Sequence, residues 1–208
     1  MYKRFIKPVS DFILALISVI VLSPVFLICI IVLLIVNRGK VFFIQQRPGK
    51  NAKLFSLIKF RTMVDRKDNN GILLPDSLRI TKTGKFMRLY SIDELPQLIN
   101  ILSGKMSFVG PRPLLAKYIP LYSPRQARRH EVKPGLTGWT QVNGRNNLAW
   151  EQKFELDVYY VENLSFFLDL EIFFKTIPKV LGSAGVMVVG RKNQDRFDVY
   201  RAKQIKPE

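Results

Sequence analysis

The sequence predicts a mixed, helix-rich α/β protein with a membrane segment near its N-terminus. The first observation behind this prediction is an uncharged, almost wholly apolar run from Phe12 to Val36. The second is a pair of apolar, aromatic-rich runs around a Pro-Gly turn, which is typical of a β-hairpin. The third is the recurrence of apolar residues at helical spacing later in the chain, which predicts amphipathic helices.

The composition limits both the partners and the chemistry of the chain. Its 208 residues suit one domain, with or without an appendage. The net charge of +17 predicts an acidic partner, which is nucleic acid, anionic lipid or a phosphorylated substrate. Cys29 and His130 are the only residues of their kinds, so a zinc site built from Cys and His is essentially excluded. We therefore expect the chemistry to come from carboxylates, cations and hydroxyls.

The apolar run predicts attachment to a membrane. As a helix it reaches about 37 Å, which exceeds the ~30 Å hydrocarbon core of a bilayer. It is too long for the core of a signal peptide, and no small-residue cleavage site follows it. Ser23 and Pro24 lie in its middle. The proline removes a helical hydrogen bond and kinks the helix, while the Ser23 hydroxyl can satisfy a freed carbonyl.

Two topologies agree with this segment. One is a kinked spanning helix, and the other is a re-entrant hairpin that enters and leaves by the cytoplasmic face. Lys and Arg flank the run on both sides, so the positive-inside rule gives no orientation. Equal charge on both flanks favours the re-entrant hairpin.

The two runs after the membrane segment, 41–46 and 54–61, predict the strands of the hairpin. Alternation would place Lys59 and Arg61 on one strand face, either as a solvated surface or as two cations that meet a diphosphate. The polar stretch 64–77 predicts a long loop, which we interpret as a mobile flap over a site.

An acidic pair, Asp93 and Glu94, stands where a helix is expected to begin. Either Ser91 and Glu94 form a capping box, or Asp93 is the cap and Pro96 falls in the first turn. In both cases the helix dipole favours ionised carboxylates, which can ligate a hard metal ion or attack an electrophile. The alternative is that both residues only cap the helix.

Several cations are candidates for binding phosphate or lipid. Arg88 lies on a short basic stretch, 84–90, just before the acidic pair. Two prolines stiffen the backbone of Arg112, which suits bidentate recognition of phosphate, although a surface arginine in a proline turn is the alternative. The dense basic cluster at 125–133 predicts a solvated face or contact with lipid headgroups. It has too few interleaved aromatic residues to predict nucleic-acid binding.

The C-terminal third predicts a loop, two helices and a tail. The glycine-punctuated stretch 134–145 permits close backbone approach to a ligand. A helix over 148–162 carries Glu155 and Asp157, which resemble the acidic pair of a metal-dependent glycosyltransferase, but residues two apart on a helix point to different sides. The stretch 164–189 is either core or an interfacial helix on the bilayer. We expect a poorly ordered polar tail at 191–208.

The order of these motifs resembles the small monotopic phosphoglycosyl transferases, which belong to the bacterial sugar transferase family. The resemblance covers roughly residues 1 to 187. The motifs that show it are Ser23-Pro24, Lys59-Phe60-Arg61-Thr62-Met63, Asp93-Glu94-Leu95-Pro96-Gln97, Gly110-Pro111-Arg112-Pro113-Leu114, Lys133-Pro134-Gly135-Leu136-Thr137-Gly138 and Val142-Asn143-Gly144-Arg145.

The resemblance implies transfer of a sugar-1-phosphate from a UDP-sugar to a polyprenol phosphate, expected to be undecaprenyl phosphate, with release of UMP. It implies that Asp93 is a nucleophile that forms a covalent phosphosugar intermediate, and that Mg²⁺ binds at Asp93 and Glu94. Arg112 matches the family's arginine between prolines, and Ser23 with Pro24 matches its re-entrant hairpin.

The remaining expectations concern the surroundings of this pair. Lys59, Arg61 and Arg112 would stabilise the leaving phosphate, and Arg88 would contact the acceptor phosphate. Gln141 and Arg145 are candidates for nucleotide or sugar contact.

We expect a re-entrant membrane hairpin at 1–38 and a catalytic domain at 39–190 on the cytoplasmic face of the bacterial inner membrane. The expected partners are a UDP-sugar, a polyprenol phosphate and membrane lipids, and not nucleic acid. Two alternatives remain open. One is a metal-dependent glycosyltransferase that uses Glu155 and Asp157 and releases UDP. The other is a non-enzymatic module that binds anionic lipid.

Overall fold

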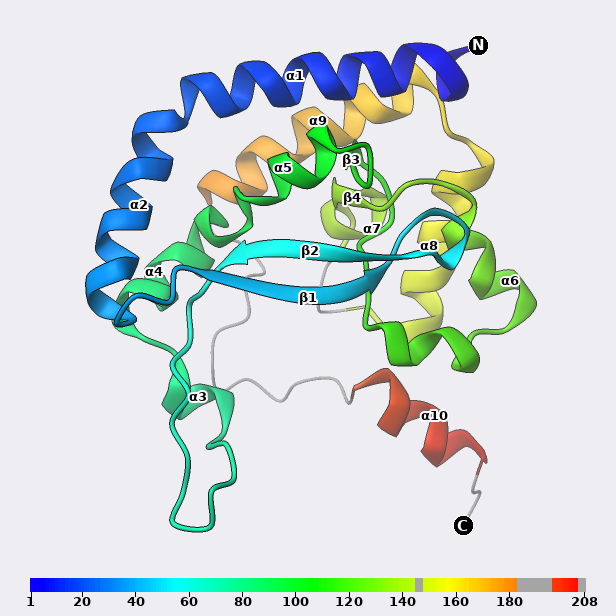
Figure 1. The fold of residues 1–208 in the computed structure, drawn as a ribbon. Helices are drawn as coiled ribbons and strands as arrows, with labels where there is room; N and C mark the ends of the chain where they lie inside the picture. Colours follow the sequence, from blue (N-terminus) through cyan, green and yellow to red (C-terminus); the bar gives the residue numbers. More distant parts are fainter. Residues whose placement is uncertain (145–147, 183–195, 206–208) are drawn as a thin grey trace.

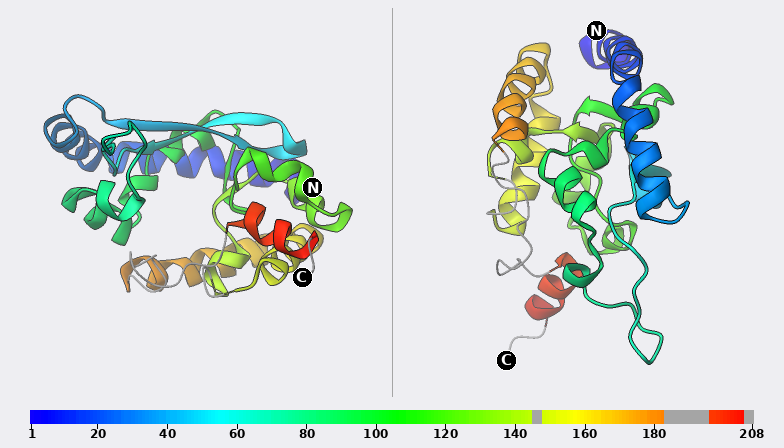
Figure 2. Two further views of the ribbon diagram at one scale, coloured as in Figure 1. Left: turned by 90° about the horizontal axis from the view of Figure 1, so that it is seen from below. Right: turned by 90° about the vertical axis from the view of Figure 1, so that its left-hand side faces the viewer.

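The structure is a computed structural model, and it describes residues 1–144, 148–182 and 196–205. Helices outnumber strands, and each of the two sheets has two strands (Figure 1). Figure 2 shows the N-terminal helices α1 and α2 on one side, α9 on the other, and the segment with α4 and α5 between them. The predicted mixed, helix-rich α/β class is therefore confirmed.

The N-terminal apolar run forms two helices that meet at a sharp bend. The axes of α1 (Lys7–Val21), which follows a helical turn at Tyr2–Ile6, and α2 (Ser23–Val36) differ by 62°. The Ser23 hydroxyl donates a 2.7 Å hydrogen bond to the carbonyl of Ile20. The expected kink, with Ser23 satisfying a freed carbonyl, is confirmed.

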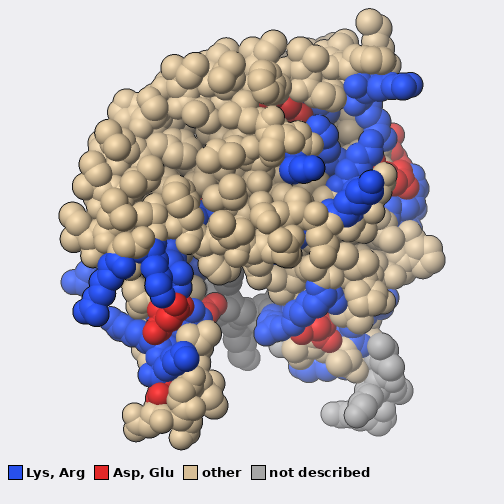
Figure 3. Space-filling view, viewed as in Figure 1, with Lys and Arg blue, Asp and Glu red and all other residues tan. Residues whose placement is uncertain are grey.

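The bend leaves each half of the run short. Taken singly, none of the helices that the structure describes is long and apolar enough to cross a bilayer, whereas α1 and α2 together meet that test by length and composition. Figure 3 shows that the surface over α2 and most of α1 is almost free of Lys, Arg, Asp and Glu.

The predicted hairpin is present. Strands β1 (Phe42–Pro48) and β2 (Leu54–Phe60) pair antiparallel, with Phe43 opposite Lys59 and Arg47 opposite Phe55. The turn between them contains a 3₁₀ segment, Lys50–Ala52. Phe55 and Leu57 on β2 are buried in one core cluster with Ala15 of α1 and Leu98. The hairpin is thereby fixed against α1.

The polar stretch that follows β2, residues 61–80, is a long loop (the polar excursion) that two isolated β-bridges hold together. Met63 pairs with Ile80, and Lys67 pairs with Leu73. A one-turn helix, α3 (Asp76–Arg79), ends it. Figure 1 shows this excursion extending away from the body of the protein.

The acidic pair does not begin a helix, and both capping predictions are wrong. Asp93 and Glu94 lie in a 3₁₀ turn (Ile92–Glu94) between α4 (Lys82–Leu89) and α5 (Gln97–Leu102). Ser91 makes no side-chain capping bond and has a φ of 57°, so it belongs to the end of α4, where a left-handed residue commonly terminates a helix. Pro96 precedes α5 and offers no side-chain cap.

The second half of the chain builds a second core. Strands β3 (Ser107–Val109) and β4 (Gly135–Thr137) pair in parallel. They pack with α8 and α9 in a cluster that includes Val109, Tyr160 and Ile172. The remaining helical segments of this half are the 3₁₀ stretches Ala116–Leu121 and Arg128–Glu131 and the helices α6 (Pro124–Ala127), α7 (Trp139–Val142), α8 (Trp150–Glu162) and α9 (Phe166–Leu181).

The C-terminal tail differs from its prediction. Residues 196–205 include a helix, α10 (Phe197–Ile205), where we expected a poorly ordered segment. Phe197 is fully buried and contacts Tyr118 and Phe154 edge-to-face, with ring centroids 5.4 and 4.9 Å apart. Lys117 also pairs with Asp198, and Arg201 Nε donates to the carbonyl of Leu121, so aromatic and polar contacts together hold this short helix.

Candidate active site

Asp93 and Glu94 lie at the junction of the hairpin, α4 and the loop after β3. Asp93 is buried, and the side chain of Glu94 is 14% exposed. The 3₁₀ turn that holds them packs against β2 and α4. The pair therefore sits on the scaffold rather than on a free loop.

Glu94 is the anchor of the site. Lys59 Nζ from β2 donates to its Oε1 at 2.6 Å. Arg112 Nη2, from the loop after β3, donates to the same oxygen at 2.5 Å, and Arg112 Nη1 lies 3.4 Å from Oε2. Burial opposes ionisation, but the charges of Arg112 and Lys59 hold the pKa of Glu94 well below its ordinary value.

Asp93 has the opposite character. Its carboxylate accepts no hydrogen bond from the residues that the structure describes, although Lys59, Arg88 and Arg112 all act on its charge. Burial and the neighbouring Glu94 charge raise the pKa of Asp93 to about 6. At pH 7 the carboxylate is then still roughly nine-tenths ionised.

The expected role of the helix dipole at Asp93 is therefore wrong. Because α5 begins only at Gln97, no helix N-terminus faces Asp93. The charges of Lys59, Arg88 and Arg112 lower the pKa of Asp93, but burial raises it by more, so the net shift is upward. The result is a carboxylate of raised pKa next to a firmly ionised one.

Arg88 is held in place by a residue to which the sequence analysis assigned no role. It lies in the last turn of α4, and its Nε donates to Thr62 Oγ1 at 2.9 Å. Thr62 is buried, so the hydroxyl is a fixed acceptor. Its place in the Lys59-to-Met63 motif was the signal that could have identified it.

Arg61 does not join Lys59. Strand β2 ends at Phe60, so alternation no longer decides where the next side chain points. Arg61 Nη2 pairs with Asp65 Oδ2 at 2.5 Å, and Arg61 Nε donates to the carbonyl of Met63. The structure thus places Arg61 at a separate ion-pair cluster in the polar excursion.

Arg112 is positioned by its backbone neighbours. Gly135 lies so close to Gly110 that a Cβ on Gly135 would meet the Gly110 nitrogen at 2.1 Å. Gly135 N also donates to the carbonyl of Pro111. These glycines permit β4 to pack on the segment that leads into Arg112.

The basic cluster is a solvated face only in part, because Arg125 and Arg128 are exposed whereas Arg129 and His130 are buried. Arg129 is buried and donates to Asp157 Oδ2 from Nε and Nη2 at 3.0 and 2.7 Å. Its Nη2 also donates to the carbonyl of Arg112 at 2.7 Å. His130 is buried as well, and burial lowers its pKa to about 4. Arg129 therefore supports the backbone of Arg112.

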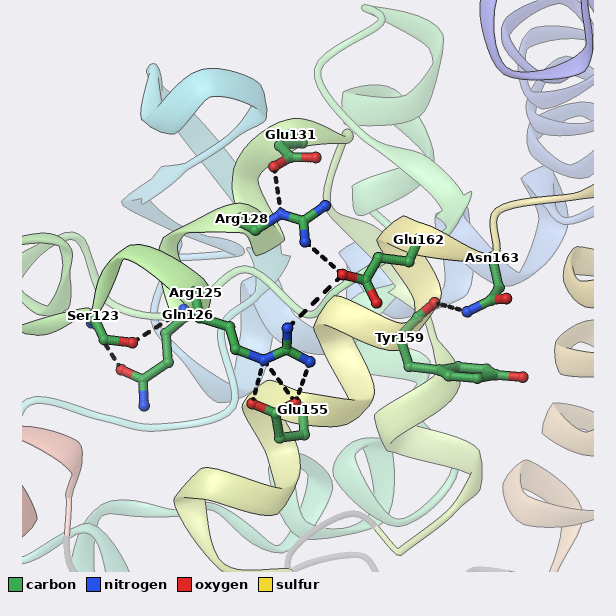
Figure 4. Close-up of polar contacts among 9 residues, drawn as sticks. All are labelled: Ser123, Arg125, Gln126, Arg128, Glu131, Glu155, Tyr159, Glu162 and Asn163. Atoms are coloured by element: carbon green, nitrogen blue, oxygen red, sulfur yellow. Dashed lines mark hydrogen bonds and ion pairs between the residues drawn. The ribbon is translucent and has the colours of Figure 1, made fainter.

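The exposed members of this cluster pair with carboxylates on α8 and nearby (Figure 4). Arg125 forms a bidentate contact with Glu155, with Nη2 to Oε2 at 2.7 Å, and Arg128 contacts Glu131 and Glu162. Glu155 thus faces an exposed arginine while Asp157 faces the buried Arg129, as the helical spacing predicted. Glu155 and Asp157 therefore each form an ion pair with an arginine, and they do not face a common site.

The two loop candidates differ in what the structure says of them. The side-chain amide of Gln141, on α7, is buried and has no hydrogen-bond partner among the described residues. Arg145 lies outside the described residues. Ser23 and Pro24 lie at the bend between α1 and α2, as described above.

The comparisons with known proteins identify the family to which the chain belongs. The model of the bacterial sugar transferase family matches residues 2–183. The chain is 57% identical over 175 residues to the uncharacterized sugar transferase EpsL of Bacillus subtilis (strain 168), which covers 84% of this chain and 87% of that protein.

Two longer relatives have named reactions. One is the UDP-N-acetylgalactosamine-undecaprenyl-phosphate N-acetylgalactosaminephosphotransferase of Aeromonas hydrophila, 37% identical over 189 residues (87% of this chain, 45% of that protein). The other is the UDP-glucose:undecaprenyl-phosphate glucose-1-phosphate transferase of Xanthomonas campestris pv. campestris, 37% identical over 187 residues (85% and 39%). As the motifs predicted, this chain belongs to the bacterial sugar transferase family.

Proposed function

We propose that this protein is a phosphoglycosyl transferase that moves a sugar-1-phosphate from a UDP-sugar to undecaprenyl phosphate and releases UMP. The observation that carries the proposal is Asp93, a buried carboxylate that accepts no hydrogen bond from the described residues and on whose charge Lys59, Arg88 and Arg112 act. Its family membership and the named reactions of its relatives support the same substrates.

The site suits a two-step displacement. A carboxylate oxygen of Asp93 attacks the phosphorus that carries the sugar, the bond from that phosphorus to the bridging oxygen breaks, and its electron pair leaves with UMP. An oxygen of the polyprenol phosphate then attacks the same phosphorus and releases the Asp93 carboxylate. An ionised carboxylate needs no general base to act as a nucleophile.

Fixed cations meet the charge that accumulates in these steps. Lys59 and Arg112 are held by Glu94, and Arg88 by Thr62, so they need little rearrangement when the phosphate arrives. Preorganised donors of this kind are the main source of electrostatic stabilisation in enzymes. Glu94 therefore serves as the anchor of the cations rather than as the attacking group.

We further propose Mg²⁺ as the cofactor, held by Asp93 of the acidic pair. In the described part of the chain no group of three or more metal-ligating side chains gathers, and Mg²⁺ sites commonly use one or two carboxylates with substrate phosphates and water. Asp93 fits this role because its oxygens have no protein partner, whereas both oxygens of Glu94 already accept from cations. When bound, the ion would supply charge stabilisation at the diphosphate.

The membrane segment is proposed to be a re-entrant hairpin on the cytoplasmic side of the bacterial inner membrane. The bent α1–α2 pair and its uncharged surface support this topology (Figure 3). On α9, Phe166, Phe167, Phe173 and Phe174 are exposed, which suits a helix that lies in the interface. Single-cysteine labelling at residues 2 to 8 should succeed only from the cytoplasmic side, and labelling only from outside would exclude the re-entrant hairpin.

The identity of the nucleotide product tests the reaction. Purified protein with undecaprenyl phosphate, Mg²⁺ and a panel of UDP-sugars should release UMP, and Asp93→Asn should release none. Glu155→Gln is the matched control, because it removes a carboxylate that pairs with an exposed arginine, and it should keep wild-type release. Release of UDP, or equal loss in both variants, would contradict the proposal.

A further inference from the structure

Arg47 lies on the same face of the hairpin as Lys59. In the register, Arg47 of β1 stands opposite Phe55, and Lys59 of β2 stands opposite Phe43. Residues two or four apart along a strand share a face, so Arg47, Phe43, Phe55 and Lys59 point to one side. Lys59 contacts Glu94 on that side. The hairpin therefore presents two cations toward the acidic pair and the loop of Arg112.

The guanidinium of Arg47 has few partners for a half-buried cation. Nη2 donates to Gln45 Oε1 at 2.7 Å, and Nη1 lies 3.4 Å from the carbonyl of Pro113. Nε is buried without a hydrogen-bond partner among the described residues. Its partners there are neutral oxygens, whereas Arg112 pairs with Glu94.

The position of Arg47 is electrostatically unfavourable for a charged guanidinium. Burial and the nearby positive charge of Arg112 lower the pKa of Arg47 to about 10. An unpaired, partly desolvated cation beside a second cation is unfavourable, and an anion that pairs with both removes the penalty. Arg112 is 47% exposed, so an anion can reach it from solvent.

We propose that Arg47 and Arg112 together bind the phosphate of the donor that leaves as UMP. The inference rests on the proposed function. Arg47 Nη1 lies 3.4 Å from the carbonyl of Pro113, the residue after Arg112, and Arg112 in turn pairs with Glu94, the neighbour of Asp93. A phosphate that pairs with both arginines therefore lies next to the anchor of the site, where the second phosphate of a diphosphate can reach it while Asp93 attacks the first.

The chemistry gives this contact a purpose. When the bond from the attacked phosphorus to the bridging oxygen breaks, that oxygen becomes part of UMP and gains one negative charge. Two guanidiniums that pair with this phosphate stabilise the charge as it develops.

The test measures adduct formation with a UDP-sugar in the absence of acceptor, and its inhibition by UMP and by uridine. For Arg47→Gln, loss of a charge-assisted phosphate contact predicts that the inhibition constant of UMP and the KM of the donor both rise by about 10- to 100-fold. Inhibition by uridine, which has no phosphate, should be unchanged. Arg47→Lys keeps the charge without the guanidinium fork and should fall between wild type and Arg47→Gln.

Two controls separate the possible failures. Arg125→Gln removes an exposed arginine that pairs with Glu155, and it should match wild type in every measurement. If the wild-type protein forms no adduct with any UDP-sugar, the proposed function fails. If the wild-type protein forms the adduct and the Arg47 variants behave like wild type, or lose UMP and uridine inhibition together, the assignment of Arg47 is wrong.

A further measurement identifies the source of the phosphate. The adduct formed on Arg47→Gln at saturating donor is isolated and offered the polyprenol phosphate. Transfer at the wild-type rate supports the donor phosphate as the ligand of Arg47. Slow transfer with unchanged donor kinetics would overturn that assignment in favour of the acceptor phosphate.

Discussion

The buried ion pair of Arg129 and Asp157 gives the sharpest stability prediction. Their side chains are 2% and 5% exposed, and Arg129 also donates to the carbonyl of Arg112. In Asp157→Asn the arginine charge stays buried without its counter-charge, which typically costs about 3–5 kcal/mol. For a chain of this size we expect Tm to fall by roughly 6–20 °C at about 2–4 °C per kcal/mol.

Glu155→Gln is the matched comparison, two residues away on α8. It breaks an equally well-formed contact with Arg125, but both side chains are more than half exposed, so the expected cost is about 0–1 kcal/mol. Thermal unfolding of both variants in one detergent, followed by intrinsic fluorescence, measures the difference. Similar Tm changes would refute the assignment of Arg129 and Asp157 as a buried support.

The same two variants also test the conventional transferase. If Glu155 and Asp157 held a catalytic metal, both substitutions would abolish activity without a large change in stability. The structure instead predicts that Glu155→Gln stays active. It predicts that Asp157→Asn loses activity only as far as Arg112 loses its support.

Three further predictions concern other parts of the fold. Thr62→Val removes the acceptor of Arg88 and should slow adduct formation by about 10-fold. Because one hydrogen bond contributes about 1 kcal/mol, Tm should fall by no more than a few degrees. An unchanged rate would contradict the positioning role of Thr62. The depressed pKa of His130, about 4, means that the unfolded chain takes up a proton first as pH falls. Stability should therefore drop by about 2 kcal/mol from pH 7.5 to pH 5, and His130→Gln should reduce that dependence; an equally steep dependence in the variant would contradict it. Phe197→Ala should cost about 3–5 kcal/mol, seen as a lower Tm, and a neutral result would mean that α10 does not pack as described.

Much of the fold could be predicted because local patterns decided it. The Pro-Gly turn between two aromatic runs specified the hairpin, and Pro24 specified the bend of the apolar run. The helical spacing that separates Glu155 from Asp157 holds in the structure, where they face different arginines. In each case neighbours in sequence carry the physical cause.

The errors have a cause in common, which is tertiary context. The pattern from Ser91 to Glu94 fits a capping box, but Ser91 has a positive φ and ends the preceding helix. The local sequence does not indicate this backbone conformation. Arg129 is buried by residues that lie far away in sequence. The same holds for Nε of Arg47, which is buried without a hydrogen-bond partner among the described residues. Charge counts along the chain identify cations, but they do not say which ones are buried.

The sequence predicted the acidic pair and Arg112 as parts of one site, but it did not predict the residues that surround them. Lys59, the acidic pair and Arg112 come from three separate motifs, and the structure joins them through Glu94. Thr62 and Arg47 escaped notice because their roles follow from which side chain they face. Arg61 shows the converse, since a residue inside a motif pairs with Asp65 in another cluster.

The intact mass of the protein after incubation with UDP-sugars and Mg²⁺, without lipid acceptor, tests the central claim most directly. The account predicts that wild type gains the mass of one sugar-phosphate, that peptide mapping places it on Asp93, and that Asp93→Asn gains none. The adduct should disappear when undecaprenyl phosphate is added. A wild-type protein of unchanged mass that still turns over donor and acceptor, or an adduct on a residue other than Asp93, would contradict it.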